Sequence, residues 1–304
     1  MTESRAWPLI TPVSTDRVLI HHVSDTHFGY RPWSYAEGDH LLDDLRKGLV
    51  PLPDLFIHTG DIVDGTASQV DTRTEDAYAL AWLDAAAFKQ PALWAMGNHD
   101  VRDRTVHTRA QWKAIYGHSA NRFVDVGGIR FITFTVDSFS GLDSLWTVPA
   151  ATWEWVAAVA STALGPVVLV SHYPPTELGG VIPENALLPQ ATLNDLIGDV
   201  PAIMGMMCGH MHKDLSDLDA ASFVTLGGRA IPLLTDLSAM LSLEGQPGRD
   251  YSGRIESKTA YVEMLPDLWR VHYRRHGGHM WGGPDGQRVT TMDLVTGTVT
   301  RGMA

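Results

Sequence analysis

The chain has 304 residues, of which 44% are hydrophobic and 19% are charged, a composition typical of a globular protein that buries a sizeable core. Its formal net charge of −12 argues against a general nucleic-acid or membrane surface, because such binding needs a basic face. The apolar runs are too short to span a bilayer and the first residues lack a secretory signal, so we expect a cytoplasmic protein. The single cysteine, Cys208, excludes an intrachain disulfide and is interpreted as a buried packing residue.

Strand-like and helix-like segments alternate through the first two-thirds of the chain. Short apolar or β-branched runs that end at Gly, Asp, Asn or His predict the strands Val18–Val23, Leu55–His58, Ala92–Met96, Val167–Ser171 and Ile203–Cys208. The clearest helix prediction is Thr72–Lys89, whose acidic first turn suits a helix N-terminus. Weaker helical patterns cover Asp39–Leu49, Thr108–Tyr116, Thr152–Leu164 and Ala191–Ile197.

A hairpin and a strand-rich C-terminal part complete the pattern. Gly127-Gly128 is a strong turn signal between Asn121–Val126 and Ile129–Asp137. Beyond His212 the sequence predicts strands around Ser222–Leu226, Ala230–Leu234, Thr259–Met264, Trp269–Arg274 and Arg288–Leu294. We therefore predict an α/β sandwich of two mixed β-sheets flanked by helices, formed by a single domain over residues 15–304. Residues 215–304 are expected to complete the second sheet or form a cap, with Ser242–Ser252 as a loop or lid.

Polar side chains follow each of the five predicted strands of the first two-thirds. These segments are Ser24-Asp25-Thr26-His27, Thr59-Gly60-Asp61-Ile62-Val63-Asp64, Gly97-Asn98-His99-Asp100, Ser171-His172-Tyr173-Pro174-Pro175 and Gly209-His210-Met211-His212. In open α/β sheets, ligands bind outside the carboxyl ends of the strands. The sequence therefore predicts that these five segments converge in one crevice.

The side chains in these segments suit a metal centre. Carboxylate, imidazole and amide oxygen are ligands for Zn, Mn or Fe. The pairs Asp25/His27 and His210/His212 place ligands at positions i and i+2, on the same side of an extended segment. Glycines beside the ligands permit tight turns and close backbone approach; they are Gly29, Gly60, Gly97 and Gly209.

The ordered set D-x-H, G-D-x-x-D, G-N-H-D, H and G-H-x-H resembles the calcineurin-like metallophosphoesterase superfamily from about Val18 to Asp214. The resemblance implies two divalent or transition metal ions, Mn, Fe or Zn. It implies that one ion is bound by Asp25, His27, Asp61 and His212. The second would be bound by Asp61, Asn98, His172 and His210, with Asp61 bridging the two ions. It also implies that His99 is a non-ligand histidine that faces the substrate phosphate, with Asp100 orienting it.

The reaction implied by this resemblance is hydrolysis of a phosphate ester by a metal-activated water. Within the superfamily, the G-N-H-D segment followed by Arg102 and Arg104, together with His-Tyr-Pro-Pro, is most like the class III cyclic nucleotide phosphodiesterases. The favoured substrate is therefore a small phosphodiester, with a cyclic nucleotide as the leading example. A phosphomonoesterase that acts on nucleotides or phosphoproteins is the alternative, and a nuclease is disfavoured by the acidic charge.

A different class of function is a non-catalytic scaffold that uses the same fold to bind a partner. Such a descendant is expected to lose metal ligands or the substrate-facing histidine, whereas this chain keeps all of them. The sequence leaves the oligomeric state open, and a homo-oligomer is compatible with it.

Other polar residues of the pattern have structural interpretations. Asp64 completes G-D-x-x-D and is expected to support its loop. His21 and His22 are adjacent in a strand and face opposite ways, so both are interpreted as structural, and His58 is expected to pack in the sheet rather than bond to the site. A C-terminal histidine cluster lacks partner carboxylates and predicts a solvated or oligomer-facing strand; its members are His272, His276 and His279.

Overall fold

The computed structural model describes residues 17–29, 32–64, 69–100, 109–117, 119–134, 148–175, 188, 190–213, 220–237, 258–276 and 288–303. The expected lid Ser242–Ser252, the basic residues Arg102 and Arg104, and His279 lie outside these ranges. No helix of the described part is long and apolar enough to cross a membrane.

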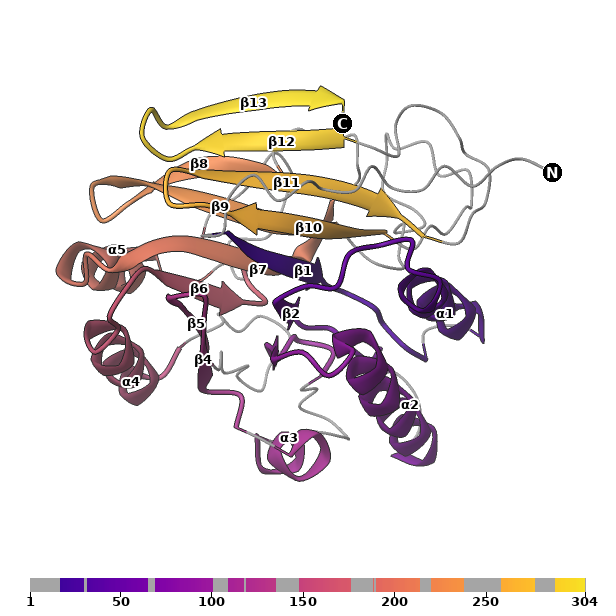
Figure 1. Cartoon of the computed structure of the whole chain (residues 1–304). Coiled ribbons are helices and arrows are strands. Elements are labelled where there is room, and N and C mark those ends of the chain that lie inside the picture. The colour runs from indigo at the N-terminus through magenta and orange to yellow at the C-terminus, as the bar shows by residue number, and fades with distance from the viewer. Residues whose placement is uncertain are drawn as a thin grey trace, which may run out of the picture.

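Two mixed β-sheets form the centre of the molecule, which confirms the predicted fold class (Figure 1). The first is seven-stranded, in the order β13 (Thr298–Met303), β12 (Arg288–Asp293), β11 (Leu268–Arg275), β10 (Lys258–Met264), β1 (Val18–Val23), β2 (Leu55–His58) and β3 (Ala92–Trp94). The second is six-stranded, in the order β4 (Arg122–Val126), β5 (Ile129–Thr133), β6 (Val167–Ser171), β7 (Ile203–Lys213), β9 (Arg229–Leu237) and β8 (Ala221–Leu226).

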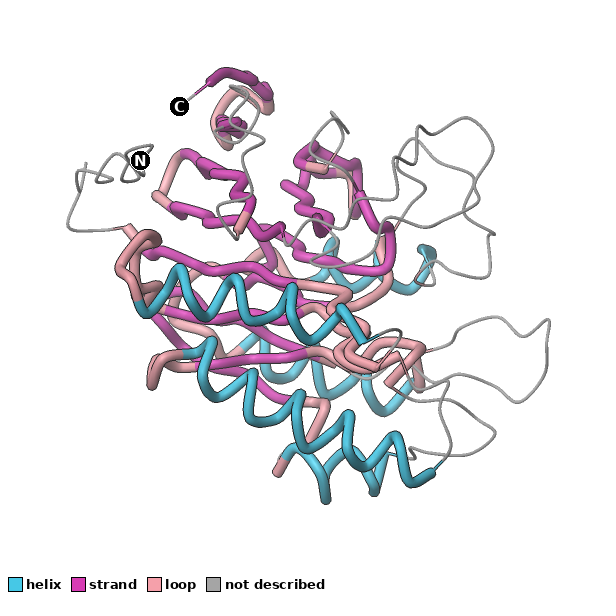
Figure 2. The backbone as a smooth tube through the Cα atoms, turned by 90° about the vertical axis from the view of Figure 1, so that its right-hand side faces the viewer, coloured by secondary structure: helices cyan, strands magenta, loops and turns pink. Residues whose placement is uncertain are grey.

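Helices cover the outer faces of both sheets. In Figure 1, α1 (Pro32–Arg46), α2 (Gln69–Ala87) and α3 (Arg109–Tyr116) lie toward the end of the molecule that carries β2, and α4 (Ala150–Ser161) and α5 (Gln190–Asp199) lie beside β6 and β7. Figure 2 shows the strands near the C-terminus at the top of the view, away from most of the helices. Helix, sheet, sheet and helix therefore follow one another as layers.

Alternation along the strands explains the layers. On β1, Leu19 packs with Phe56 in a cluster shared with α1 and α2, whereas Ile20 packs with residues of the second sheet such as Val170. A third cluster joins the outer face of the second sheet to α4 and α5. Successive strand residues point to opposite faces, so a strand buried on both faces is mainly apolar, as β6 is up to its last residue, Ser171. β1 is also buried throughout, but it carries two histidines, His21 and His22. Cys208 is fully buried in the third cluster, as the sequence predicted.

The C-terminal strands divide between the two sheets. β8 and β9 extend the second sheet, where β9 pairs parallel with β7. β10 pairs antiparallel with β1 and continues through β11, β12 and β13 at the edge of the first sheet. The sequence did not predict β13, which pairs antiparallel with β12 and whose residues are mostly exposed.

The histidines of β11 and its end are buried, which corrects the expectation of a solvated strand. His272 Nε2 lies 3.3 Å from Glu263 Oε2, and this carboxylate also accepts from Arg17 Nη1 and Arg270 Nη1 at 2.8 and 3.0 Å. His276 Nδ1 lies 3.0 Å from Asp44 Oδ2 of α1. Asp44 lies far away in the sequence, on α1, and Glu263 lies on the neighbouring strand β10, so both contacts depend on how these elements pair and pack.

We expect Glu263→Gln to destabilise the protein at neutral pH by about 1–2 kcal/mol, after allowing for solvent screening through the part-exposed arginines. Burial raises the pKa of Glu263, but His272, Arg17 and Arg270 outweigh burial and hold the pKa at about 2. A carboxyl with a lowered folded pKa stabilises above its unfolded pKa of about 4.3 and loses that contribution as pH falls toward the folded value.

Urea midpoints of wild type and Glu263→Gln, measured with chelator present from pH 7 to pH 3, check this expectation. The stability difference should be constant above about pH 5 and shrink below about pH 4.3. A difference that stays the same at every pH would mean that the ion pairs do not produce it.

Candidate metal centre

The five polar segments meet at one end of the two sheets. Asp25 and His27 follow β1, Asp61 follows β2, and Asn98 follows β3, in three strands that pair in parallel. His172 follows β6, and β7 runs parallel to β6 beside it. Parallel strands end at the same edge of a sheet, which is the physical reason that residues from these loops converge.

β7 differs from the expected strand because it continues to Lys213 instead of ending at Cys208. His210 and His212 therefore lie within the far end of a strand. The pairing with β9 is irregular between Cys208 and Lys213, and both histidines have positive φ angles, 73° and 46°. This irregular backbone turns the two imidazoles toward the loops of the first sheet.

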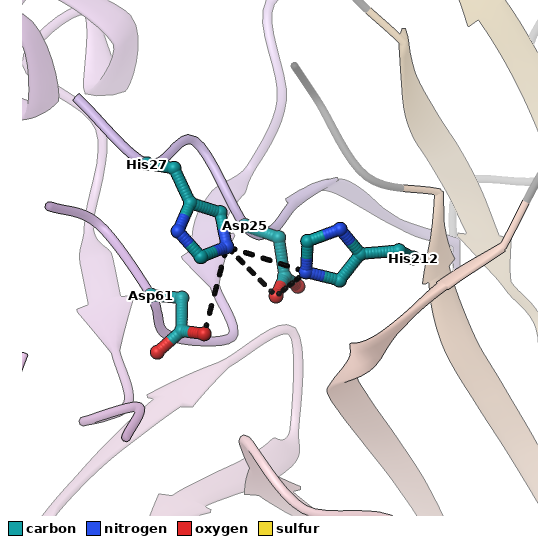
Figure 3. Close-up of side chains that lie close together, drawn as sticks. All are labelled: Asp25, His27, Asp61 and His212. Atoms are coloured by element: carbon teal, nitrogen blue, oxygen red, sulfur yellow. Dashed lines mark hydrogen bonds and ion pairs between the residues drawn. The ribbon is translucent and has the colours of Figure 1, made fainter. Parts of the chain in front are cut away.

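The first cluster contains Asp25, His27, Asp61 and His212 (Figure 3). His27 Nε2 lies 3.2 Å from His212 Nε2 and 3.6 Å from Asp61 Oδ2. His212 Nε2 lies 3.0 Å from Asp25 Oδ1. Two nitrogens and two carboxylate oxygens from two loops and β7 thus face one small volume.

The second cluster contains Asp61, His172 and His210, and the amide of Asn98 joins it. His172 Nε2 lies 3.0 Å from Asn98 Oδ1, 3.1 Å from His210 Nδ1 and 3.3 Å from Asp61 Oδ2. His172 Nδ1 is 2.9 Å from the carbonyl oxygen of Thr59, which can only accept, so Nδ1 carries a proton. That bond fixes the ring and turns Nε2 toward the other donor atoms of the cluster.

Asp61 belongs to both clusters. Its Oδ2 is the atom that faces His27 in the first cluster and His172 in the second. Its Oδ1 accepts from the backbone N–H of His99 at 2.7 Å, which holds the carboxylate in place. One carboxylate therefore lies between two sets of nitrogen and oxygen donors.

The spacing of these donor atoms fits metal coordination. Ligands that hold an ion at about 2.0–2.2 Å are separated from one another by roughly 3.0–3.5 Å, for angles from square to tetrahedral. The separations of 3.0–3.3 Å around His172 Nε2, and 3.2 Å between His27 and His212, fall in this range. Imidazole, carboxylate and amide oxygen are also the donor types that Zn, Mn and Fe accept. The residues present therefore fit two metal ions.

The electrostatics of the clusters favour cations. Burial lowers the pKa of His27, but Asp25, Asp64 and Asp61 outweigh burial and raise it to about 10. Burial likewise lowers the pKa of His172, and Asp61 and Asp25 raise it to about 9. Buried carboxylates thus draw positive charge to the imidazoles, and a metal ion supplies that charge in place of protons.

The backbone at the site is held in an uncommon conformation. Five non-glycine residues of the clusters have positive φ angles between 42° and 73°: Asp25, His27, Asp61, His210 and His212. Such conformations cost free energy and persist only where the surrounding structure fixes them, as at ligand sites.

Three glycines make the close approach possible, as the sequence predicted. A Cβ atom on Gly97 would collide with the Asp61 carboxylate, one on Gly60 with His172, and one on Gly209 with Ser24. Because a side chain at these positions would push the loops apart, glycine is required by contact at all three, and at Gly60, with a φ of 100°, by conformation as well.

The structure separates the roles of the two carboxylates near His99. Asp100 Oδ1 accepts from the backbone N–H groups of Ile62 and Val63 at 2.9 and 3.2 Å, and its Oδ2 accepts from Gly97 N at 2.8 Å. Asp100 therefore joins two loops through their backbone instead of contacting the His99 ring. The sequence favoured an orienting role over that of a helix cap or loop carboxylate, and these contacts are those of a loop carboxylate.

Asp64 lies beside the His99 ring instead. His99 Nδ1 is 2.8 Å from the Asp64 carbonyl oxygen and 3.5 Å from its carboxylate Oδ1, and His27 Nδ1 is also 3.5 Å from that Oδ1. A carbonyl only accepts, so His99 Nδ1 carries a proton and Nε2 is the nitrogen left for chemistry. The sequence motif named Asp64, but its spacing could not show which histidines it meets.

Comparison with known proteins places this arrangement in a family. Residues 18–214 match the model of the calcineurin-like phosphoesterases, and the chain belongs to this family. Membership implies a metal-dependent hydrolase of phosphate esters, and it confirms the resemblance found in the sequence.

Two relatives illustrate the likeness. A probable cyclic nucleotide phosphodiesterase of Rhodococcus erythropolis is 26% identical over 242 residues, which is 75% of each chain. Among solved structures, a dimetal phosphatase from Danio rerio superimposes with a TM-score of 0.59 at 12% identity, covering 85% of this chain and 96% of that one. The second similarity shows a shared fold.

Proposed function

We propose that the protein is a binuclear metal-dependent phosphodiesterase whose substrate is a small diester such as a cyclic nucleotide. The observation that carries this proposal is the position of Asp61 between two donor sets, with the His99 ring beside His27 of the first set. The similarity to the Rhodococcus erythropolis relative supports a diester over a monoester.

The proposed ligands are those of the two clusters. Asp25, His27, Asp61 and His212 hold the first ion, and Asp61, Asn98, His172 and His210 hold the second. Manganese, iron and zinc match these donors. Paired metal ions, when bound, polarise the phosphoryl oxygens and lower the pKa of an attacking water.

The chain itself supplies a proton and fixed geometry. We propose that His99 stabilises the charge that gathers on the phosphoryl group or protonates the leaving oxygen through Nε2. The Asp64 carbonyl keeps the Nδ1 proton in place and so sets the direction of the ring. The Asp100 carboxylate joins its loop to that of Asp61 by accepting from the backbone N–H groups of Ile62 and Val63, and it also accepts from Gly97 N within its own loop.

Further aspects of the proposal concern the whole molecule. Residues 15–304 are proposed to form one domain, because strands from beyond residue 214 pair with β1 and β7. The cytoplasmic setting and a homo-oligomeric state stay predictions from the sequence.

We expect the purified protein to hold close to two transition-metal ions per chain and to lose hydrolysis on chelation. Elemental analysis and a substrate panel check this expectation. The panel contains cyclic nucleotides, nucleoside monophosphates, an aryl diester and an aryl monoester, each with Mn, Fe or Zn. Faster cleavage of diesters supports the proposal.

Other results of that experiment have definite meanings. A preference for monoesters with all three metals would assign the alternative, a phosphomonoesterase. Full occupancy with a single ion, or activity indifferent to chelator, would contradict the binuclear centre. Bound metal without cleavage of any ester would favour a scaffold that retains the ligands.

A further inference from the structure

His58 is a fully buried polar residue at the end of β2, three positions before Asp61. The sequence favoured packing in the sheet over a bond to the site. Its ring does contact Trp82 of α2 edge-on, but its two nitrogens make specific polar contacts. These contacts lead to the loops that carry the first metal cluster.

The hydrogen-bond donors fix the tautomer of His58. The backbone N–H of Gly60 donates to His58 Nδ1 at 3.2 Å, so Nδ1 carries no proton. Burial lowers the pKa of His58 to about 3, so the ring is neutral and its proton lies on Nε2. Nε2 is 3.2 Å from the Thr26 hydroxyl and therefore donates to it.

The Thr26 hydroxyl continues the connection. It accepts from His58 and donates to the Ile62 carbonyl oxygen at 2.8 Å. Thr26 lies between Asp25 and His27 in one loop, whereas Gly60 and Ile62 flank Asp61 in the other. A single path of three hydrogen bonds thus joins the two loops at the residues next to three first-cluster ligands.

The backbone of the two loops is in an unfavourable conformation that needs support from its surroundings. Asp25, His27 and Asp61 have φ angles of 52°, 42° and 52°, and Gly60 has a φ of 100°. Backbone hydrogen bonds also join the loops, from Asp25 N to Gly60 O and from His27 N to Asp61 O. Those bonds set the separation of the loops, and the side-chain path holds the left-handed turns that direct the ligands.

We propose that His58 is a positioning residue of the metal centre, which acts through Thr26 to fix the loop of Asp25 and His27 against the loop of Asp61. This inference rests on the proposed metal centre. Outer partners of metal ligands typically change metal affinity by about 10–100-fold when they are replaced. The same range is expected here for the first ion.

The test compares metal affinity in isosteric variants by competition with a chromophoric chelator. Thr26→Val removes the hydroxyl at constant shape, and His58→Phe removes both ring nitrogens. Each should weaken binding of one ion by about 10–100-fold. Thr26→Ser keeps a hydroxyl and should restore binding close to that of wild type.

A matched control exists on β1. His21 is equally buried, and its Nε2 is 3.0 Å from the hydroxyl of Thr259 on β10. This contact continues to His276 and then to Asp44 of α1, rather than to the loops of Asp25 and Asp61. Thr259→Val should lower the melting temperature of the metal-free protein while leaving metal affinity unchanged. The melting temperature of every metal-free variant is measured alongside.

The outcomes separate this inference from the proposed function. A wild-type chain that binds no transition metal would overturn both. Two ions in wild type with unchanged affinity in Thr26→Val and His58→Phe would overturn the positioning role alone. An equal loss of metal affinity in Thr259→Val would mean that any loss of stability weakens metal binding, and it would also overturn the positioning role of His58.

Discussion

Replacing Asp61 with alanine is expected to release both metal ions and abolish hydrolysis. The Oδ2 atom of Asp61 faces His27 in one cluster and His172 in the other, so its removal opens both donor sets. The loss of affinity should exceed the about 10–100-fold typical of an outer partner, because a ligand itself is removed. Elemental analysis after dialysis, together with chelator competition, measures the effect.

Two further variants sharpen this expectation. Asp61→Asn keeps the size of the side chain and an oxygen that can accept from His99 N–H, but it removes the negative charge. It should fold like wild type and still lose metal. His27→Ala belongs to the first cluster alone and should mainly weaken one ion. Retention of both ions at wild-type affinity in Asp61→Ala would refute the bridging position.

His99→Ala should keep both ions and lose most of kcat on an ester with a poor leaving group, by about 10²–10⁴-fold. The backbone N–H of His99, which the substitution preserves, is the group that holds Asp61. The imidazole lies beside His27 without belonging to the Asp61–His172–His210 set. Activity and metal content measured on the same preparation separate chemistry from metal binding.

The leaving group distinguishes two roles for His99. An activated aryl ester needs little protonation, so it should lose less rate than the poor substrate if proton donation is the main role. Equal losses on both esters would assign charge stabilisation to the imidazolium instead. Turnover close to wild type on both esters would remove His99 from the mechanism.

The local sequence was sufficient to locate the strands that carry the site. β1, β2 and β6 have the predicted bounds. A short run of mainly apolar residues, bounded by glycine or polar residues, marks a buried strand without reference to the rest of the chain. The alternation of strands and helices predicted an open α/β sheet, in which the loops that follow the strands lie together at the carboxyl ends of the strands. The glycines beside the ligands were also readable, since the close contacts leave no room for a side chain.

Contacts between distant segments could not be read in this way. Asp100 follows His99 directly, whereas Asp64 lies 35 positions away in the sequence. Only the folded loops show that Asp64 meets the His99 ring while Asp100 accepts from backbone N–H groups. The partners of His272 and His276 come from β10 and α1. Such pairs depend on how sheets and helices pack, which the spacing of residues along the chain does not contain.

The sequence by itself therefore determined the family, the α/β layers and the donor types of a metal centre, because motif order and strand periodicity are properties of the chain. Tertiary structure decided how Asp61 lies between two donor sets, which carboxylate meets His99, and how His58 reaches Thr26. The candidate ligands Asp25 and Asp61 also have left-handed backbone. That conformation is unfavourable for an isolated non-glycine residue, so only the packing of the whole fold can impose it.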